Sequence, residues 1–375
     1  MTEKVPLKET ALNHARITRI GREVQAVCPA FDAEGFARDV LADFPQLELK
    51  ARIARTSEAL SAYLPVTGAQ AVELLLRSLP TTPEDAGATT DFGLYIYAPH
   101  SDFVARFCRT GEDLDCALEA LRRLSPYFSA EDAVRYFIND FPEDTLNAIE
   151  SWTRDTDHRV RRLASESTRP RLPWSPRITL ELDAALPILE RLHTDSSRFV
   201  TRSVANHLHD IAFDRPDIVL DTLGRWKSSA QTAREEFTFI AREALRTRLK
   251  AGHPAAYEFL GYPSDPPVEL SPIHLERTRL SDGDTLEFSV DLSTSSAANL
   301  RVNYVIASPS QRGASREKVY FLKTATAAAG QTLRLAKRHT VQSTSTSTLR
   351  PGAYTLTIQV NGRRFCHPEF QVVER

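Results

Sequence analysis

The sequence predicts a mainly α-helical superhelix over residues 1–262, followed by a smaller all-β sandwich over residues 268–375. From residue 10 to about residue 260, apolar residues recur at spacings of three and four, which is the period of amphipathic helices. After a proline-rich joint at residues 261–267, Thr, Ser and Val become frequent and apolar residues alternate with polar ones, as in half-buried strands. A third observation, an internal repeat, predicts how the helices stack.

The repeat has a period of forty residues and needs no gap. A fainter third copy places Ile240 and Arg242 another forty residues on. Two helices per unit at this period are typical of HEAT-type solenoids, in which helix pairs stack into a curved array with a concave binding face. The matched pairs are Leu146 with Leu186, Glu150 with Glu190, Asp155 with Asp195, Val160 with Val200, and Arg162 with Arg202.

Individual helices can be predicted within these repeats. LDCALEALRRL from Leu114 has the helical period, and so has SAEDAVRYFI, for which we expect Ser129 to cap the N-terminus. Trp152 occupies the repeat position of Leu192, so we expect it in the core.

The C-terminal segment predicts about six or seven strands in roughly 105 residues, which is the size of an immunoglobulin-like sandwich. Turn signals at Asp282-Gly283 and Pro351-Gly352 separate some of them. The clearest strands are TLEFSVDLS, LRVNYVIAS, KVYFLKTAT, QTLRLAKRHT and AYTLTIQVNG.

The 375 residues suggest two or three domains, and their composition excludes several classes. No apolar run approaches the ~20 residues of a membrane span, and the N-terminus lacks a secretion pattern, so we expect a cytoplasmic protein without membrane contact. The cysteines form no C-x-x-C pair, which predicts reduced, mostly buried thiols rather than a zinc site or disulfides. They are Cys28, Cys108, Cys116 and Cys366.

Charge is distributed unevenly, although the net charge is only −2. Lys and Arg number 16 against 25 Asp and Glu in residues 1–155, 17 against 13 in residues 156–250, and 14 against 9 in residues 267–375. Two basic segments after an acidic one indicate a surface that faces a polyanion, with an ordinary solvated face as the alternative.

A polar stripe at four-residue spacing runs along the second helix of each repeat. Residues four apart share a helix face, so stacked repeats would present a band of cations that encloses a few carboxylates. A solvated outer face is again the alternative interpretation. The stripe consists of Arg162 and Glu166; Arg202, Asn206 and Asp210; and Arg242, Arg246 and Lys250.

Several stretches between residues 10 and 262 resemble a known family. They are FGLYIYAPHSDFVARF, FSAEDAVRYFI, HRVRRLASESTRPRLPW, TRSVANHLHDIAFDRPD and IAREALRTRLKAGHP. They are similar to the bacterial 3-methyladenine DNA glycosylases of the AlkC family, which have HEAT-like repeats and in some members a C-terminal immunoglobulin-like domain. The chain departs from the family's usual Gly at Ser167, Asn at His209 and His at Glu243, and the last change removes a potential cation from the stripe.

The resemblance implies a monofunctional DNA glycosylase of base excision repair. It would hydrolyse the N-glycosidic bond of N3-alkylated bases, 3-methyladenine first and 3-methylcytosine as a second candidate, without flipping the base. The implied partner is double-stranded DNA that contains alkylated bases, and the protein would be a nucleoid-associated monomer that needs no cofactor or metal. A non-catalytic HEAT-repeat scaffold that binds nucleic acid or protein is the alternative.

Candidate site residues combine the stripe with the matched segments. An N3-alkylated base is cationic, so carboxylates and aromatic faces could stabilise it, and neighbouring arginines should keep those carboxylates ionised. We favour Asp210 among the carboxylates, because it follows Arg202 on the stripe; Glu131 could instead be an ordinary acid at a helix N-terminus. The catalytic candidates are Asp210, Glu131, Glu166 and Trp174. The DNA-binding candidates are Arg161, Arg162, Arg169, Arg171, Arg202, Asn206, Arg242, Arg246 and Lys250.

Overall fold

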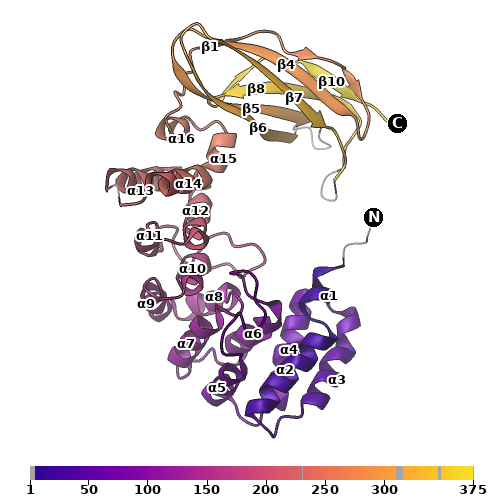
Figure 1. Cartoon of the computed structure of the whole chain (residues 1–375), viewed down its shortest axis with the longest axis vertical. Helices are drawn as coiled ribbons and strands as arrows, with labels where there is room; N and C mark the ends of the chain where they lie inside the picture. Colours follow the sequence, from indigo (N-terminus) through magenta and orange to yellow (C-terminus); the bar gives the residue numbers. More distant parts are fainter. Residues whose placement is uncertain (1–4, 230, 310–315, 345–347, 375) are drawn as a thin grey trace. The chain divides into compact units, whose positions relative to one another are not determined.

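The computed structural model describes residues 5–229, 231–309, 316–344 and 348–374. The chain divides into two compact units, which we describe separately (Figure 1). The helical unit contains residues 1–214 and 224–240, and the β unit contains residues 215–223 and 241–375. This division falls earlier in the chain than the predicted boundary at residues 262–268.

The helical unit begins with a short helix and continues as a series of helix pairs. No single described helix is long and apolar enough to cross a membrane. The two helices Leu49–Tyr63 and Gly68–Ser78 together have the length and composition of a membrane span, but the chain bends by 112° between them. Its helices are α1 (Leu7–Ala11), α2 (His14–Val27), α3 (Ala33–Asp43), α4 (Leu49–Tyr63), α5 (Gly68–Ser78), α6 (Ala98–Phe107), α7 (Leu114–Leu124), α8 (Glu131–Asp140), α9 (Pro142–Trp152), α10 (His158–Ser167), α11 (Leu186–Leu192) and α12 (Arg198–Ala212), with 3-10 turns η1 (Phe44–Gln46) and η2 (Tyr95–Tyr97). Helices α13 (Pro216–Ser229) and α14 (Arg234–Ala244) are shared between the units.

Two rows of helices make up most of this unit. Helices α4, α6, α8, α10 and α12 contact one another in that order, and α5, α7 and α9 form the second row (Figure 1). Helices α9 and α11 both pack against α10. The paired-helix stacking that the repeat predicts is therefore confirmed.

The repeated aspartates explain why the forty-residue period is visible in the sequence. Asp155 and Asp195 lie in the turns after α9 and α11, and each accepts the backbone N–H two residues further on at 2.8 Å. Each also pairs with an arginine from the preceding helices: Arg122 Nη1 is 2.5 Å from Asp155, and Arg161 Nε is 2.6 Å from Asp195. The forty-residue period therefore coincides with ion pairs that join successive repeats.

The predicted cap at Ser129 is wrong. Helix α8 begins at Glu131 with Ala130 at the N-cap position, and no side chain caps it. The Ser129 hydroxyl instead donates to the Glu131 carboxylate, because both side chains face the same pocket.

The predicted core side chains are largely confirmed. Trp152 is buried, as its repeat position indicates. All four cysteines are free; Cys28 and Cys108 are buried, whereas Cys116 and Cys366 are only partly buried. Burial raises the pKa of the Cys108 thiol to about 12, so this thiol stays protonated.

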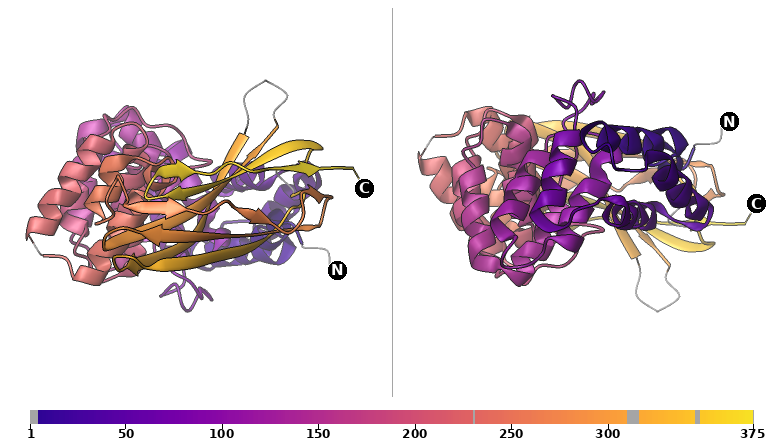
Figure 2. Two further views of the ribbon diagram at one scale, coloured as in Figure 1. Left: turned by 90° about the horizontal axis from the view of Figure 1, so that it is seen from above. Right: turned by 90° about the horizontal axis from the view of Figure 1, so that it is seen from below.

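The β unit contains two sheets that enclose a common core (Figure 2). In one sheet β7 pairs along most of β4, and β1 and β2 pair with successive stretches of β4; the other sheet has the order β3-β10-β8-β5-β6, with β9 also paired to β8. All pairs are antiparallel except β3 with β10. The strands are β1 (Val268–Leu270), β2 (His274–Leu275), β3 (Arg279–Leu280), β4 (Thr285–Thr294), β5 (Ala298–Ser308), β6 (Arg316–Ala327), β7 (Thr332–Thr340), β8 (Gly352–Val360), β9 (Arg363–Phe365) and β10 (Glu369–Val372).

The two faces of the larger sheet explain why the units divide before residue 262. Strand β4 alternates buried and half-buried residues, as one solvated face requires, but β5 and β8 bury both faces near their middle. Their outer face is covered by α15 (Arg246–Lys250) and α16 (Pro254–Phe259). There the Tyr257 hydroxyl lies 3.2 Å from Asn303 Nδ2 and 3.3 Å from Gln359 Nε2. These last helices therefore belong to the β unit.

Candidate functional site

Five charged side chains of alternating sign form a continuous row on α8, α10, the following loop and α12. Glu131 lies 3.7 Å from Arg162, and Arg162 lies 3.4 Å from Glu166. Glu166 lies 2.6 Å from Arg169, which lies 2.9 Å from Asp210. We call these five residues the charged row. It joins the three carboxylates that the sequence proposes.

Glu166 lies between the two arginines of the row. One carboxylate oxygen faces Arg162 and Arg169, and the other accepts the Ser203 hydroxyl at 2.6 Å. Burial raises the pKa of Glu166, but the two guanidiniums and the hydroxyl lower it further than burial raises it. The carboxylate is therefore ionised at neutral pH.

Asp210 is held by Arg169 through two hydrogen bonds. Arg169 Nε and Nη2 donate to the two carboxylate oxygens at 2.9 and 3.3 Å, and the Arg171 backbone N–H approaches at 3.4 Å. Burial raises the pKa of Asp210, whereas hydrogen bonds from His209 and Arg169 lower it below its usual value. Asp210 is thus a second ionised, nearly buried carboxylate.

Arg162 is buried against two aromatic rings that also contact each other. Its guanidinium carbon lies 5.1 Å from the ring centre of Phe92 and 4.7 Å from that of Phe199, and Nη1 donates to Ser129 at 2.7 Å. Stacking on aromatic faces stabilises a guanidinium away from water. This geometry suits Arg162 to ordering Glu131 and Glu166, and it leaves the side chain little access to a phosphate.

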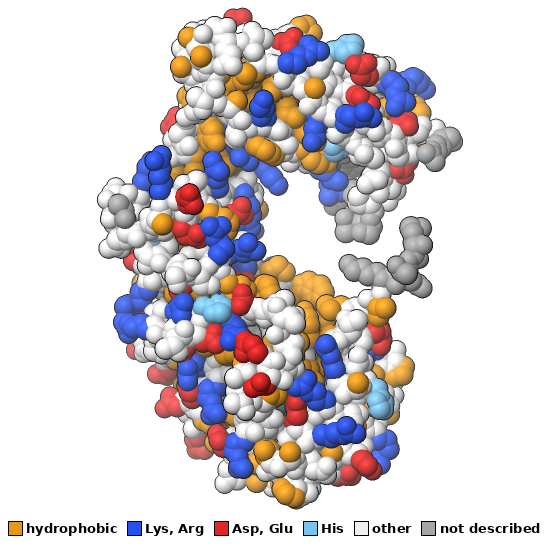
Figure 3. All heavy atoms as spheres, viewed as in Figure 1, with side chains coloured by type: hydrophobic (Ala, Val, Ile, Leu, Met, Phe, Trp, Pro, Cys, Tyr) orange, Lys and Arg blue, Asp and Glu red, His pale blue; other side chains and the backbone are white. Residues whose placement is uncertain are grey.

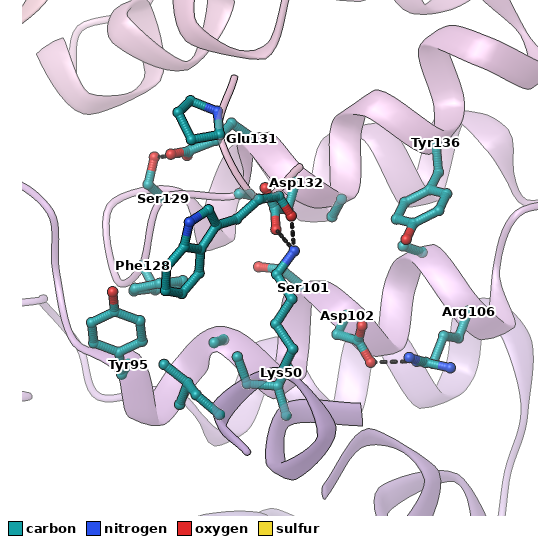
Figure 4. A pocket seen from close by; sticks show the side chains of 18 of the residues that line it. Lys50, Tyr95, Ser101, Asp102, Arg106, Phe128, Ser129, Glu131, Asp132 and Tyr136 are labelled. Carbon is teal, nitrogen blue, oxygen red and sulfur yellow. Dashed lines mark hydrogen bonds and ion pairs between the residues drawn. The ribbon is translucent and has the colours of Figure 1, made fainter. Parts of the chain in front are cut away.

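Glu131 and Trp174 line a pocket of about 520 Å³ beside α4, α6 and α8 (Figure 4). The Glu131 side chain is 19% exposed, against 6% for Glu166 and 5% for Asp210, so it is the most accessible carboxylate of the row. Trp174 is 77% exposed. The other lining residues are Leu7, Leu49, Lys50, Ile53, Tyr95, Ala98, Ser101, Asp102, Ala105, Arg106, Phe128, Ser129, Ala130, Asp132, Ala133, Tyr136 and Pro173.

The loop that carries Arg169, Arg171 and Trp174 is fixed by one face of α8. The buried Arg135 donates to the carbonyls of Pro176, Ser167 and Arg169 at 2.6, 3.0 and 2.7 Å. Burial lowers the pKa of Arg135 to about 10, which still leaves it charged at neutral pH.

Asp132 and Asn139, on the same face of α8, bind the loop on either side of Arg135. Asp132 accepts the Ser175 hydroxyl, and Asn139 Nδ2 donates to the Arg177 carbonyl at 2.8 Å. Helix α8 thereby determines where Arg169 meets Asp210.

Arg161 and Arg171, which are also proposed to bind DNA, have acidic partners as well. Arg161 pairs with Asp195 and donates to two backbone carbonyls, so the geometry favours a structural role for it. The exposed Arg171 pairs with Asp214 at 2.9 Å and lies over the Phe213 ring. Binding of a phosphate by Arg171 would compete with Asp214.

Arg202 and Asn206 lie on α12 as the stripe predicts, with Arg202 exposed and Asn206 partly buried. No hydrogen bond or ion pair joins Arg202 to another described residue, so it is available to a ligand. The repeat matches Arg202 to Arg162, yet one side chain is exposed and the other buried. Equal positions in the repeat do not have equal environments here.

The third part of the stripe is interrupted. Helix α14 ends at Ala244 and α15 begins at Arg246, so Arg242, Arg246 and Lys250 do not share one helix face, contrary to the prediction. Arg242 and Lys250 are exposed, and Arg246 contacts Glu243. These residues belong to the β unit, so their place beside the charged row stays a prediction.

The face of the helical unit seen in Figure 3 shows basic and acidic side chains interspersed rather than a continuous basic band. Among the described residues, no group of three or more His, Cys, Asp or Glu is arranged to hold a metal ion.

Sequence reasoning missed Arg135, Ser203, Phe92 and Phe199. An arginine within the apolar stretch AVRYFI is a signal that could have indicated a buried Arg135. Nothing in the local pattern around Phe92 indicates that its loop reaches Arg162, 70 residues further on in the sequence.

Comparisons with known proteins agree with this geometry. A solved structure of the alkylpurine DNA glycosylase AlkC of Pseudomonas fluorescens, bound to DNA containing an abasic site analogue, is 31% identical; it matches 98% of this chain and 99% of that chain with a TM-score of 0.88. The uncharacterized protein YhaZ of Bacillus subtilis (strain 168) is 29% identical over 364 residues, covering 96% of this chain and 98% of YhaZ. Residues 269–374 match the family described as "Uncharacterised protein YhaZ, C-terminal Ig-like domain".

Proposed function

Because the chain belongs to the AlkC family, we propose that it is a DNA glycosylase that hydrolyses the N-glycosidic bond of N3-alkylated bases in double-stranded DNA. We propose 3-methyladenine as its main substrate and 3-methylcytosine as a second one. The relative with the bound DNA is an alkylpurine DNA glycosylase, which supports the reaction class.

The observation that carries the proposal is the charge balance of the charged row. Three carboxylates, Glu131, Glu166 and Asp210, are joined by two guanidiniums, so the five groups of the row have a formal charge of −1 when all are ionised. The buried Arg135 interacts electrostatically with Glu166 and Asp210, but its hydrogen bonds go to backbone carbonyls. A negative cluster weakens binding to the DNA backbone, so general DNA affinity does not explain it. It would stabilise the positive charge of an N3-alkylated base and of the sugar from which that base departs.

The chemistry needs little else from the protein. When the bond between C1′ and the base nitrogen breaks, its electron pair stays with the base and neutralises the alkylated ring, so the leaving group needs no proton. The sugar becomes an oxocarbenium ion, which an ionised carboxylate stabilises. Water then adds at C1′ and its proton passes to a carboxylate or to solvent. Asp210 and Glu131 would provide the negative charge, with Glu166 and Arg169 positioning Asp210.

DNA contacts would come from basic side chains outside the row. Arg202 and Asn206 are the best placed in the helical unit, and Arg242, Arg246 and Lys250 would act from the β unit, whose excess of basic residues would add affinity. We further propose that the protein acts as a monomer, without flipping the base, in the cytoplasm at the nucleoid.

Release of the free base tests the proposal directly. Double-stranded DNA methylated at random is incubated with the full chain, and released bases are separated by chromatography. We expect 3-methyladenine to appear in the supernatant faster than it does from the same methylated DNA incubated without the protein. Tight binding of methylated DNA with no released base would instead support a non-catalytic HEAT-repeat scaffold.

A further inference from the structure

We propose that the pocket beside Glu131 is a product subsite, which holds the free alkylated base after its bond to deoxyribose has broken. The ligand class is a planar heteroaromatic ring with hydrogen-bonding edges. The inference rests on the proposed glycosylase function, because that reaction supplies the ligand.

The pocket adjoins the charged row through Glu131. This side chain lines the pocket and also lies 3.7 Å from Arg162 of the row. A cleaved base that leaves the duplex beside the row would therefore meet the pocket at Glu131. Figure 4 shows Glu131 and Ser129 on the same side of the pocket, bonded to each other.

The walls of the pocket suit a flat ring. The ring centres of Tyr95 and Phe128 lie 4.8 Å apart with the ring planes tilted by 44°, so the two rings pack on each other and form one aromatic wall; small apolar side chains, Ala98 and Ala105 among them, line the α6 side. All nucleic-acid bases stack favourably on aromatic side chains. The volume of about 520 Å³ lies within the range usual for small-molecule sites and leaves room for a purine.

Polar groups at the pocket could bind the edges of the base. Ser101 lines the pocket, is only 5% exposed, and its hydroxyl has no hydrogen-bond partner among the described residues. A buried hydroxyl without a partner is costly, so a ligand that bonds to it is favoured. Glu131 can accept a hydrogen bond from an exocyclic amino group. Lys50 and Asp132, in contrast, bind each other at 3.2 Å.

The backbone at Trp174 is held in an unusual conformation next to this pocket. Its φ of +69° lies in the left-handed region, which residues other than Gly rarely adopt. Lys50 Nζ donates to the Trp174 carbonyl, and Ser175 binds Asp132. Such a conformation persists only where the surrounding structure holds it, and it is often found at functional sites. Here it keeps a 77% exposed indole at the pocket, where a bound base could cover it.

Tryptophan fluorescence of the full chain, titrated with 3-methyladenine in the absence of DNA, tests the inference. The other tryptophans, Trp152 and Trp226, are buried, so quenching reports mainly on Trp174. We expect saturable quenching. Phe128→Ala should weaken the affinity about tenfold by removing a stacking face. Ser101→Ala, which removes an unpartnered hydroxyl and should fold normally, should weaken it about fivefold.

Phe107→Ala is the matched control, because Phe107 is an exposed aromatic residue of α6 that does not line the pocket. It should leave the affinity unchanged. If the wild-type chain excises 3-methyladenine but shows no saturable quenching up to millimolar base, or if Phe128→Ala and Ser101→Ala both bind like the wild type, the subsite inference is overturned and the proposed function stands. If the base binds as expected but none is excised from DNA, the proposed function fails, and the pocket is a base-binding site but not a product subsite.

Discussion

Two regions of the helical unit use pairs of a carboxylate and an arginine for different purposes. In the turns after α9 and α11, Asp155 and Asp195 each bind one arginine and one backbone N–H, and Arg122, the partner of Asp155, also binds Glu119. In the charged row, three carboxylates share two arginines. The turns repeat along the sequence and the row does not. The comparison teaches that the aspartates of the turns join successive repeats through local contacts that recur in the sequence, whereas the carboxylates of the row meet only in the folded chain, at the site where the proposed reaction needs positive charge to be stabilised.

Removing Arg169 should break the charged row most severely. Arg169→Leu leaves Glu166 and Asp210 nearly buried without their shared partner, and loss of one member of a buried pair costs about 3–5 kcal/mol. We expect the free energy of unfolding, measured with urea, to fall by about this amount. The double variant Arg169→Leu, Asp210→Asn should recover part of the loss, because one unpaired charge is removed. Equal stability of the single variant and the wild type would show that the pairing is weak.

Asp210→Asn tests whether the excess acid is catalytic. The amide keeps the shape of the side chain but loses the charge, so excision of 3-methyladenine should slow by on the order of 10²–10³-fold in single turnover. DNA affinity should change little. Glu131→Gln and Glu166→Gln, assayed in parallel, rank the three acids.

Asp195→Asn is the control for that experiment. Asp195 forms an equally close arginine pair and is equally buried, but it lies in a turn. It should share the loss of stability and keep the rate of excision. If Asp210→Asn and Asp195→Asn slow excision to the same extent, the loss reflects stability and the distinction between the two regions fails. Normal excision by Asp210→Asn with a dead Glu131 or Glu166 variant would move the catalytic assignment to that residue.

Acidification should weaken the fold before it affects the charged row. Burial lowers the pKa of His100 and of His207 to about 4, from 6.5, so the unfolded chain binds more protons than the folded chain between these values. Stability is therefore complete above pH 6.5 and falls with pH down to about 4, by about 2 kcal/mol for each histidine between pH 7 and pH 5. The pKa values of Glu166 and Asp210 are lowered, so their contribution is lost only below about pH 4.5 and 3.8.

Urea titrations at pH 7 and pH 5, together with excision rates at both, check this separation. The urea concentration at the midpoint of unfolding should be lower at pH 5 than at pH 7. The single-turnover rate of excision by the folded protein should be the same at both pH values. His207→Asn should reduce the pH dependence of stability. An excision rate that falls between pH 7 and pH 5 in step with one proton would mean that a carboxylate of the row titrates there.

The smallest effect is expected outside both regions. Arg202 is exposed on α12, with no partner among the described residues. Arg202→Ala should weaken DNA binding a few-fold and lower the slope of log affinity against log salt by about one, as expected for one lost phosphate contact. Stability should be unchanged. Arg161→Ala, in a turn pair, should do the opposite, with lower stability and the same salt slope; if the two variants behave alike, the assignment of Arg202 to DNA is wrong.

The sequence alone determined the elements and their stacking. Helical period, strand alternation and the forty-residue repeat depend on local backbone geometry and on packing between neighbours in the chain, and α9 to α12 and strands β4 to β8 lie where these patterns predict. The repeat also brought Asp155 and Asp195 into view, because each binds within its own turn and to the preceding unit. The candidate carboxylates came from the stripe and from the resemblance.

Only the tertiary structure decided which charges meet. Arg169 and Asp210 are 41 residues apart and are joined by a loop that α8 holds through Arg135, 34 residues before Arg169. Arg162 is buried because a loop from residue 92 covers it, whereas its repeat partner Arg202 is exposed. The path of an irregular loop has no period, and it depends on distant hydrogen bonds and ring contacts. For that reason the sequence could propose both the acids and the arginines of the site, but it assigned Arg162 and Arg169 to DNA and not to the carboxylates that they hold.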